Sequence, residues 1–361
     1  MKSRRVVISG GGTGGHLYPA LAVGEKLRSR EPSLGLTFIG SHRAIEKSLM
    51  ERQGAHFIPM RIEGLKGRGL KSLRTIAILP FAFARSLAIL LRLRPALVIG
   101  VGGYSSGPVV LTASLIGIPT IILEQNLTPG FTNRLLIRWA TRAVVAFERS
   151  LDYFKGKGVW LGNPVREKFY RIRPKPQAGE FVLLVFGGSQ GARVLNRTMT
   201  AALPLLAPFK GRLRVIHQTG AAEYEAVKAA YIENGLADAA VAPFFHDMAG
   251  RFEMADLIIS RAGATTIAEL IVARRAAILV PFARAADDHQ AKNAGELARV
   301  GAAEVILEKD LSPGLLAGRI KFYIENRERT MEMQSNLAAL RTDRPADRIA
   351  DLCFTLIGAG S

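Results

Sequence analysis

The stretch Val6–His16, VVISGGGTGGH, decides the fold, because an apolar strand runs into a cluster of glycines and then into a helical segment. The segment Phe181–Ala192, FVLLVFGGSQGA, repeats this order near the middle of the chain. Around both segments apolar strands alternate with helical stretches, a pattern typical of parallel sheets covered by helices. The sequence therefore predicts an α/β fold with two Rossmann-like domains, whose parallel sheets face each other across a cleft.

The length of the chain also indicates two domains, since 361 residues exceed what one ordinary hydrophobic core holds. We expect an N-terminal domain over residues 1–165 and a C-terminal domain over residues 166–344. Between them, the Pro-rich segment 171–180, RIRPKPQAGE, is typical of a linker. A final helix over residues 345–361 is expected to pack back on the N-terminal domain.

The basic excess of the chain lies mostly in its first half. Lys and Arg number 23 against 8 Asp and Glu in residues 1–165, but 26 against 22 in the remainder. A basic domain suits nucleic acid, anionic lipid or phosphorylated ligands. No recognisable nucleic-acid-binding motif is present, so we expect no nucleic-acid partner. A single cysteine, Cys353, and an N-terminus unlike a signal peptide favour a reducing, cytosolic setting.

An apolar segment over residues 75–95, TIAILPFAFARSLAILLRLRP, is interrupted by Pro80 and Arg85. It contains no charge-free run near the roughly 20 residues that a membrane span needs. Eight basic residues lie between Arg61 and Arg94, with one acidic residue, Glu63. Apolar surface beside cations favours contact with an anionic membrane surface. The alternative is a buried helix with a solvated basic end.

Three glycine-rich loops, at residues 10–15, 100–108 and 186–192, each join a strand to a helix. Glycine lets the backbone approach a ligand closely, and a helix start favours anions. We therefore expect polyphosphate ligands near the cleft. No Asp-x-Asp pair, P-loop or Cys/His ligand pattern is present, so we expect neither a metal site nor a cofactor.

Two other enzyme classes share parts of these loops. Gly10, Gly12 and Gly15 match the dinucleotide fingerprint, but the usual acidic residue about 20 positions on is missing. Arg43 stands near that place and is suited to the phosphate of NADP, which leaves an NADP oxidoreductase open. The segment Gly103–Gly107, GYSSG, also matches the serine-hydrolase elbow G-x-S-x-G.

Six motifs, taken together and in order, resemble the MurG family of peptidoglycan N-acetylglucosaminyltransferases, which belongs to the GT-B superfamily of glycosyltransferases. The resemblance runs from Val6 to about Ala303. The motifs are GGTGGHLYPA (11–20), GVGGYSSGP (100–108), LEQN (123–126), GNPVR (162–166), GGSQGA (187–192) and SRAGATTIAE (260–269).

This resemblance implies an inverting enzyme that moves GlcNAc from UDP-GlcNAc to the 4-hydroxyl of MurNAc in undecaprenyl-diphosphate-MurNAc-pentapeptide (lipid I). The product is lipid II, a precursor of peptidoglycan on which cell shape and division depend. The family implies a peripheral protein at the cytoplasmic face of the inner membrane, without a metal or cofactor. Its expected partners are UDP-GlcNAc, lipid I, an anionic membrane surface and other proteins of cell-wall synthesis. A membrane-lipid hexosyltransferase of the same fold and a nucleotide-sugar-binding protein without turnover remain alternatives.

By motif position, the resemblance assigns the donor to the second half of the chain. Glu269 is expected to bind the ribose hydroxyls, and backbone groups at Phe245 to read the uracil edge. Gln290 is expected to bind the GlcNAc hydroxyls, although the surrounding ARAADDHQAKNA carries one residue more than the family pattern. The remaining expected donor contacts are Arg166, Ser189, Gln190, Ala264, Thr265 and Thr266.

The first half is assigned the acceptor and the catalytic base. Asn126 is expected to reach the sugar, while Thr13, Gly14 and Gly15 lie near the diphosphates and residues 102–107 serve the acceptor's diphosphate. His16 is the first candidate for the base, because a neutral imidazole accepts a proton near pH 7. Glu124 is the second candidate. The alternatives are a turn-capping role for His16 and a loop-fixing role for Glu124.

Overall fold

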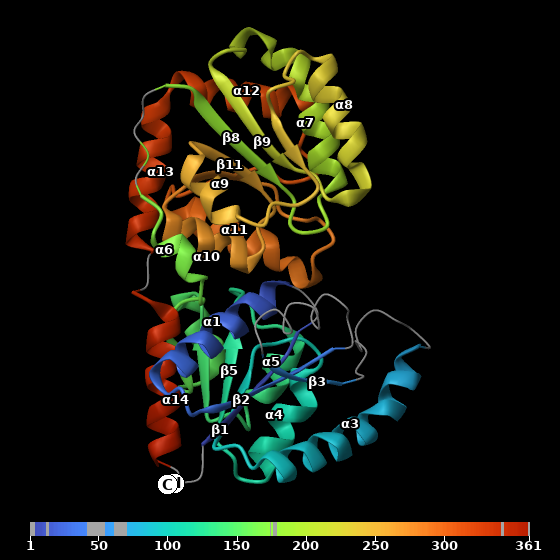
Figure 1. Cartoon of the computed structure of the whole chain (residues 1–361), viewed down its shortest axis with the longest axis vertical. Helices are drawn as coiled ribbons and strands as arrows, with labels where there is room; N and C mark the ends of the chain where they lie inside the picture. Colours follow the sequence, from blue (N-terminus) through green and yellow to red (C-terminus); the bar gives the residue numbers. More distant parts are fainter. Residues whose placement is uncertain are drawn as a thin grey trace. The chain divides into compact units, whose positions relative to one another are not determined.

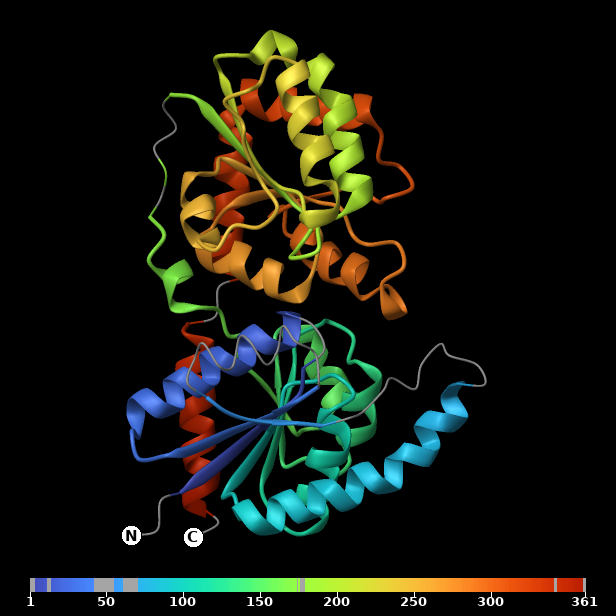
Figure 2. The same cartoon turned by 45° about the vertical axis from the view of Figure 1, so that its right-hand side comes forward.

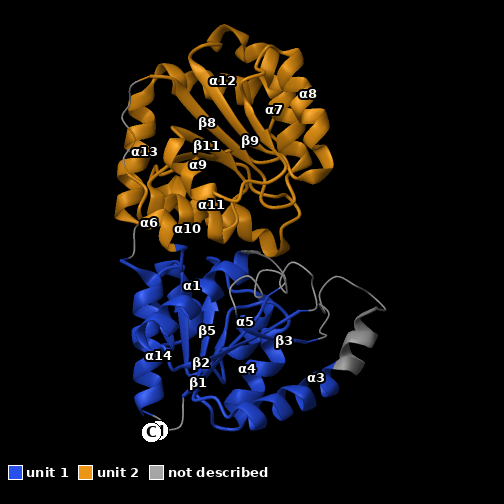
Figure 3. Cartoon of the chain, viewed as in Figure 1, with its two compact units in different colours: residues 1–166, 342–361 blue, residues 167–341 orange. Residues whose placement is uncertain are grey.

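The computed structural model describes residues 4–11, 14–41, 55–60, 71–173, 175, 179–340 and 343–359, with the backbone alone described at 71–78. The chain divides into two compact units (Figure 3). Unit 1 comprises Met1–Arg166 and Thr342–Ser361, and unit 2 comprises Glu167–Arg341.

Unit 1 is built on a seven-stranded parallel sheet in the order β3-β2-β1-β4-β5-β6-β7 (Figure 1). The central strands are short runs of apolar, largely β-branched residues that are buried along their length, as expected for a parallel sheet between two helical layers. The strands are β1 (Arg5–Ser9), β2 (Gly35–Gly40), β3 (His56–Pro59), β4 (Leu97–Gly100), β5 (Thr120–Glu124), β6 (Arg142–Val145) and β7 (Gly158–Trp160).

Alternate residues of β1 contribute to cores on opposite faces of this sheet. Val6 and Ile8 pack with α1 (Gly14–Arg30) and α14 (Pro345–Ala359). Val7 packs on the other face, with α3 (Lys71–Leu93), α4 (Ser106–Leu115) and α5 (Phe131–Leu136). The strict alternation follows from the two-residue period of a strand.

The last helix, α14, lies beside α1 although the two are separated by most of the chain (Figure 2). Its apolar side, which includes Ile349, Cys353 and Ile357, is at most 2% exposed within the core of unit 1. Asp347 accepts from both Lys26 (3.1 Å) and Arg30 (3.2 Å) of α1. An apolar stripe and an ionic edge therefore hold the chain's final helix in the first unit.

Unit 2 is built on a six-stranded parallel sheet in the order β10-β9-β8-β11-β12-β13. One face of β8 packs with α7 (Arg193–Leu206), α8 (Tyr224–Glu233) and α12 (Pro313–Glu325), while Phe186 contacts Phe252 of α9 (Met248–Met254) from the other face. The strands are β8 (Phe181–Phe186), β9 (Leu213–Gln218), β10 (Ala240–Ala242), β11 (Leu257–Ser260), β12 (Ala276–Leu279) and β13 (Glu304–Val305). The other helices described in unit 2 are α6 (Glu167–Tyr170), α10 (Ala264–Ala273), α11 (His289–Arg299) and α13 (Arg327–Ala339), with 3₁₀ turns η2 (Ala207–Phe209), η3 (Ala221–Glu223) and η4 (Ala286–Asp288). The 3₁₀ turn η1 (Glu148–Phe154) lies in unit 1.

The segment predicted as a linker is tied to unit 2 where it is described. Arg275 is 1% exposed and donates to five backbone carbonyl oxygens, one of which is that of Arg173. Lys175 pairs with the buried carboxylate of Asp256, which also accepts from the Val182 amide (2.7 Å). These contacts give the buried charges partners, as burial requires.

The apolar segment of the first half forms α3, a 23-residue helix with Pro80 inside it. Among the described residues, no helix is long and apolar enough to cross a membrane.

Candidate functional site

Each unit presents glycine-rich loops where the order of its strands reverses. In unit 1, β1 lies between β2 and β4, so the loops that follow β1 and β4 meet at the carboxyl ends of these strands. The amide of Gly11 donates to the carbonyl oxygen of Gly102 (3.4 Å), which joins the two loops. Such reversal points are the usual ligand sites of open α/β sheets. Gly14 and Gly15 begin α1 here, whereas Thr13 lies outside the described residues.

His16 packs against the loop that follows β4. A Cβ atom at Gly102 would lie only 2.8 Å from Cε1 of the His16 ring. Its Nδ1 atom lies 3.2 Å from Oε1 of Gln125. The amide nitrogen of Gln125 donates to the carbonyl oxygen of Val101 (3.0 Å), which fixes the amide so that its oxygen faces His16. Nδ1 of His16 therefore carries the hydrogen, and in the neutral ring Nε2 has the basic lone pair.

Glu124 is 3% exposed, and both of its carboxylate oxygens accept hydrogen bonds from the loop that follows β5. Oε1 accepts from the amide (2.9 Å) and side chain (3.2 Å) of Asn126. Oε2 accepts from the Gly130 amide and the Asn133 side chain, both at 2.9 Å. This geometry favours a loop-fixing role for Glu124, the alternative that the sequence left open, and it orients Asn126.

Arg166 lies in unit 1, where its guanidinium stacks over the ring of Tyr18, 4.6 Å from the centroid. Unit 1 also bears on the two other enzyme classes, the NADP oxidoreductase and the serine hydrolase. Arg43, on which an NADP site depends, lies outside the described residues. Ser105, the middle residue of the G-x-S-x-G match, is 4% exposed, whereas a nucleophile elbow presents its serine to the substrate.

The reversal point of unit 2 lies between β8 and β11. The loop after β8 exposes Ser189 and Gln190. The chain leaves β11 through Gly263 and enters α10, whose first turn holds Ala264, Thr265 and Thr266. A helix start with small residues suits a diphosphate because the amides and the helix dipole both favour anions.

Glu269 lies on α10, one turn beyond the helix start, and is 5% exposed. A carboxylate at this depth suits a pair of vicinal hydroxyls. The other residues expected to bind the donor, Phe245 and Gln290, follow β10 and β12. The Phe245 amide donates to Oε1 of Gln218 (2.8 Å), and the Arg251 guanidinium lies 4.9 Å from the Phe245 ring centroid.

Gln290 lies in the first turn of α11, where its Oε1 accepts from the amide of Phe282 (3.0 Å). The two residues just before this helix, Asp287 and Asp288, have φ values of 56° and 52°. Two consecutive non-glycine residues in the left-handed region are strained. This turn lies in the stretch ARAADDHQAKNA, where the resemblance led us to expect one residue more than the family pattern.

Two residues that the sequence analysis did not single out belong to this geometry. Gln125 fixes the His16 ring, and it stands in the LEQN motif between Glu124 and Asn126, both of which the resemblance assigns to the site. Arg261, the second residue of SRAGATT, donates to the carbonyl oxygens of Val280 and Pro281 and to Oε2 of Glu308 (3.1, 3.2 and 2.6 Å). Membership in the motifs was the available signal for both. In the described part of the chain, no three His, Cys, Asp or Glu side chains are grouped to hold a metal ion.

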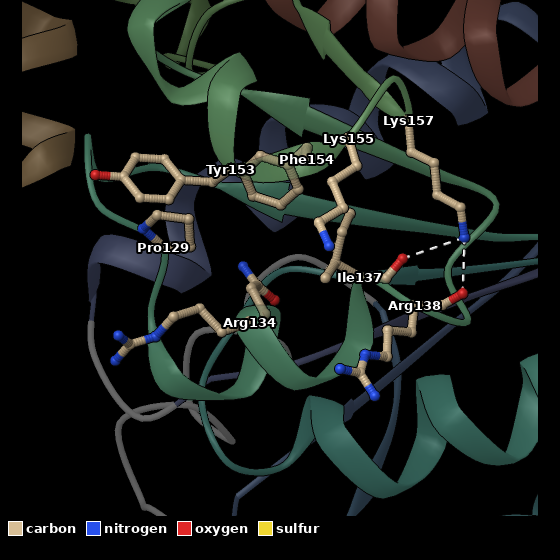
Figure 4. Close-up of a pocket in the computed structure, with 9 residues that line it drawn as sticks. Pro129, Arg134, Ile137, Arg138, Tyr153, Phe154, Lys155 and Lys157 are labelled. Atoms are coloured by element: carbon tan, nitrogen blue, oxygen red, sulfur yellow. Dashed lines mark hydrogen bonds between the residues drawn. The ribbon is translucent and has the colours of Figure 1, made fainter.

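A separate hollow of about 470 Å³ lies on unit 1, between α5 and η1 (Figure 4). Lys157 closes one end by donating to the carbonyl oxygens of Ile137 (3.2 Å) and Arg138 (2.8 Å). Four cations and no acidic residue line it: Arg134, Arg138, Lys155 and Lys157 stand beside Pro129, Asn133, Ile137, Tyr153 and Phe154.

Comparison with known proteins covers nearly the whole chain. Residues 6–145 match the glycosyltransferase family 28 N-terminal domain, and residues 182–349 match the C-terminal domain of that family. The UDP-N-acetylglucosamine--N-acetylmuramyl-(pentapeptide) pyrophosphoryl-undecaprenol N-acetylglucosamine transferase of Syntrophus aciditrophicus is 43% identical, over 98% of this chain and 99% of the relative. The enzyme of the same name from Myxococcus xanthus is 42% identical, over 98% of this chain and 93% of the relative.

A solved structure agrees with these sequence matches. The crystal structure of Acinetobacter baumannii MurG is similar with a TM-score of 0.78 and 32% identity, covering 98% of this chain and 99% of that one. The predicted fold class is therefore confirmed: both units are parallel-sheet α/β domains of the GT-B type. The chain belongs to glycosyltransferase family 28, and within it to the MurG family.

Proposed function

We propose that this chain transfers GlcNAc from UDP-GlcNAc to the 4-hydroxyl of MurNAc in lipid I, forming lipid II with inversion at the anomeric carbon. The observation that carries the proposal is the 43% identity over 98% of the chain to transferases named for this reaction. The glycine-rich loops at both strand-reversal points support it, since donor and acceptor each contain a diphosphate.

Unit 2 supplies most of the donor site in this proposal. The loop at Ser189 and Gln190 and the first turn of α10 face the diphosphate, where Ala264, Thr265 and Thr266 stabilise the charge that develops on UDP. Glu269 accepts hydrogen bonds from the ribose hydroxyls, and backbone groups at Phe245 read the uracil. Gln290 binds the sugar hydroxyls. Arg166 contributes a further contact to the donor.

Unit 1 supplies the acceptor site and the base. The glycine loops bind the acceptor diphosphate, Thr13 among them, and Asn126 contacts the sugar. The acceptor O4 forms a bond to the anomeric carbon while the bond from that carbon to the β-phosphate oxygen breaks, and UDP leaves with the electron pair. Nε2 of His16 takes the hydroxyl proton, because Gln125 fixes the hydrogen of the ring on Nδ1. The transition state has oxocarbenium character.

In this scheme Glu124 fixes the conformation of the loop after β5 and does not accept the substrate proton. Its oxygens already accept hydrogen bonds from Asn126, Gly130 and Asn133, which hold the loop that carries Asn126. A carboxylate so occupied would have to give up loop contacts to accept a substrate proton.

We also propose that unit 1 contacts an anionic membrane surface at the cytoplasmic face of the inner membrane. Large apolar residues are exposed on α3, α4 and α5 and just beyond α5: Phe81 (76%), Leu91 (58%), Leu115 (66%), Leu135 (53%) and Trp139 (46%). The basic hollow of Figure 4 borders α5, so that cations stand next to apolar side chains. Such a combination suits the headgroup region of a membrane.

Vesicle binding tests this contact. Reversing Arg138 and Lys155 to Glu should reduce binding to vesicles containing phosphatidylglycerol at least tenfold, since each cation near such a surface contributes about 1 kcal/mol. Lys309→Glu, on the surface of unit 2, is the matched control and should leave binding unchanged. Equal binding by all three proteins would place the membrane contact elsewhere.

The transfer reaction itself is tested with labelled UDP-GlcNAc and a lipid I analogue in detergent, with and without EDTA. Product that requires the acceptor and persists in EDTA is the expected result. No product, from a protein that binds UDP-GlcNAc, would overturn the proposed acceptor and favour another membrane lipid.

A further inference from the structure

Gln218, the last residue of β9, joins the two loops on either side of its strand. It is 2% exposed, and both ends of its amide are used. Its Nε2 donates to the carbonyl oxygen of Gly188 (3.0 Å), in the loop after β8. Its Oε1 accepts from the amide of Phe245 (2.8 Å), in the loop after β10.

The order of the strands explains how one side chain reaches both loops. β9 lies between β8 and β10, and Gln218 pairs in register with Phe186 on one side and with Ala242 on the other. All three strands end at this level, so their loops emerge together. Gln218 is thus the residue of the middle strand that can touch both neighbours with one side chain.

Backbone contacts bring the same loops together just beyond Gln218. The amide of Thr219 donates to Ala242 (3.0 Å), and that of Gly220 donates to Pro243 (3.1 Å). On the other side, a Cβ atom at Gly191 would overlap the carbonyl oxygen of Thr219. At these points the loop after β9 contacts the loops after β8 and β10 directly. The Gln218 amide, by contrast, bridges the Gly188 carbonyl and the Phe245 amide.

We propose that Gln218 is a positioning residue for the donor, in a role that rests on the proposed function. The loop at Gly188 and Ser189 takes the diphosphate and the Phe245 backbone reads the uracil, so Gln218 sets the spacing between the two halves of UDP. Binding of the intact nucleoside diphosphate depends on this spacing. Binding of uridine alone requires only the contact to Phe245.

Substitutions at Gln218 can separate the contributions of its two hydrogen bonds. In Gln218→Glu, a carboxylate oxygen still accepts from the Phe245 amide, but nothing donates to Gly188. In Gln218→Met, both hydrogen bonds are lost while the side chain keeps a similar size. Tyr231→Phe is the matched control, because it removes a hydroxyl that is buried in the same unit and bonded to His217 (3.1 Å) rather than to either loop.

Calorimetric titration with UDP and with uridine is the primary test. We expect the Kd for UDP to rise about tenfold in Gln218→Glu, the change that losing one good hydrogen bond produces, and to rise further in Gln218→Met, which loses both. The Kd for uridine should remain unchanged in Gln218→Glu and rise in Gln218→Met. The KM for UDP-GlcNAc should rise with the Kd for UDP while kcat stays within about twofold of the parent value, because the lost contact serves ground and transition states alike.

Three results would overturn the proposal. These are an unchanged Kd for UDP in both variants, an equal loss of UDP affinity in Tyr231→Phe, and a loss in Gln218→Glu that disappears in high salt and so reflects only the new charge. The titrations need no lipid acceptor. A parent protein that binds UDP but makes no lipid product would therefore contradict the transfer reaction and leave this inference standing.

Discussion

His16 donates from Nδ1 to the side-chain oxygen of Gln125, 3.2 Å away, although 109 positions separate the two residues. The first turn of α1 and the residue that follows β5 thus together fix one tautomer of the His16 imidazole. The catalytic role proposed for His16 depends on this contact.

Replacing Gln125 with Leu should lower kcat by about 10–100-fold, the usual effect of losing the partner that orients a functional histidine. The KM for UDP-GlcNAc should stay unchanged, because Gln125 orients the His16 ring and has no proposed contact to the donor. His16→Ala should lose turnover by a factor on the order of 10²–10⁴ and retain UDP binding. For both variants, steady-state kinetics measure kcat and KM, and titration with UDP measures nucleotide binding. A normal kcat in His16→Ala would make His16 a structural residue and restore Glu124 as the candidate base.

Glu124→Gln should destabilise unit 1, because an amide nitrogen would replace an acceptor that faces two N–H donors. We expect a loss of roughly 2–3 kcal/mol in the free energy of unfolding, as for hydrogen bonds to a charged group. Urea denaturation measures the loss, with Glu148→Gln, on an exposed site of the same unit, as control. A variant of full stability whose kcat has collapsed would instead assign the base to Glu124.

Gly191 and Gly211 form a matched pair for testing the donor loop. Both have positive φ values, 74° and 81°, but a Cβ atom has open space at Gly211 and overlaps the Thr219 carbonyl at Gly191. Gly211→Ala should cost about 1 kcal/mol of stability from backbone strain alone. Gly191→Ala should cost more than about 3 kcal/mol, since the backbone must also shift, and should weaken UDP binding. Thermal melts with and without UDP compare the two, and equal shifts would show that the loops can separate freely.

His217 should make unit 2 sensitive to acid. It is fully buried between Tyr231 and Asn196, and burial lowers its pKa from 6.5 to about 3. Between pH 6.5 and about pH 3, His217 binds a proton in the unfolded chain but not in the folded chain. The free energy of unfolding therefore falls as the pH falls through this range. The expected slope is about 1.4 kcal/mol per pH unit.

The comparison that isolates this effect is between the parent chain and His217→Gln, followed by urea denaturation from pH 7 to pH 4. The variant should be less stable at pH 7 but lose less stability on acidification. Parallel curves would show that His217 does not contribute to the acid sensitivity.

The sequence predicted the central strands and their glycine turns because those signals are local. Val182–Phe186, for example, is apolar throughout, as a strand buried on both faces must be. The short strands β3, β7, β10 and β13 were not predicted. They lie at or near the edges of their sheets, and their residues are half-buried, so they lack a continuous apolar run.

The candidate site could be predicted only as a set of loops. Residues such as Ser189 and Glu269 were found through the motifs that contain them. The contacts that orient site residues join distant positions: 109 residues separate His16 from Gln125, and 27 separate Gln218 from Phe245. No local pattern encodes such pairs, because they depend on the order in which parallel strands lie in the sheet.

The docking of α14 on α1 has a consequence for how the chain folds during synthesis. Ile349, Cys353 and Ile357 fill part of the core of unit 1, yet they are made after all of unit 2. A nascent chain can complete the core of its second unit while the first still exposes the apolar side of α1. The half of the protein that is translated first is therefore the half whose core is closed last, when the ribosome has delivered the final helix.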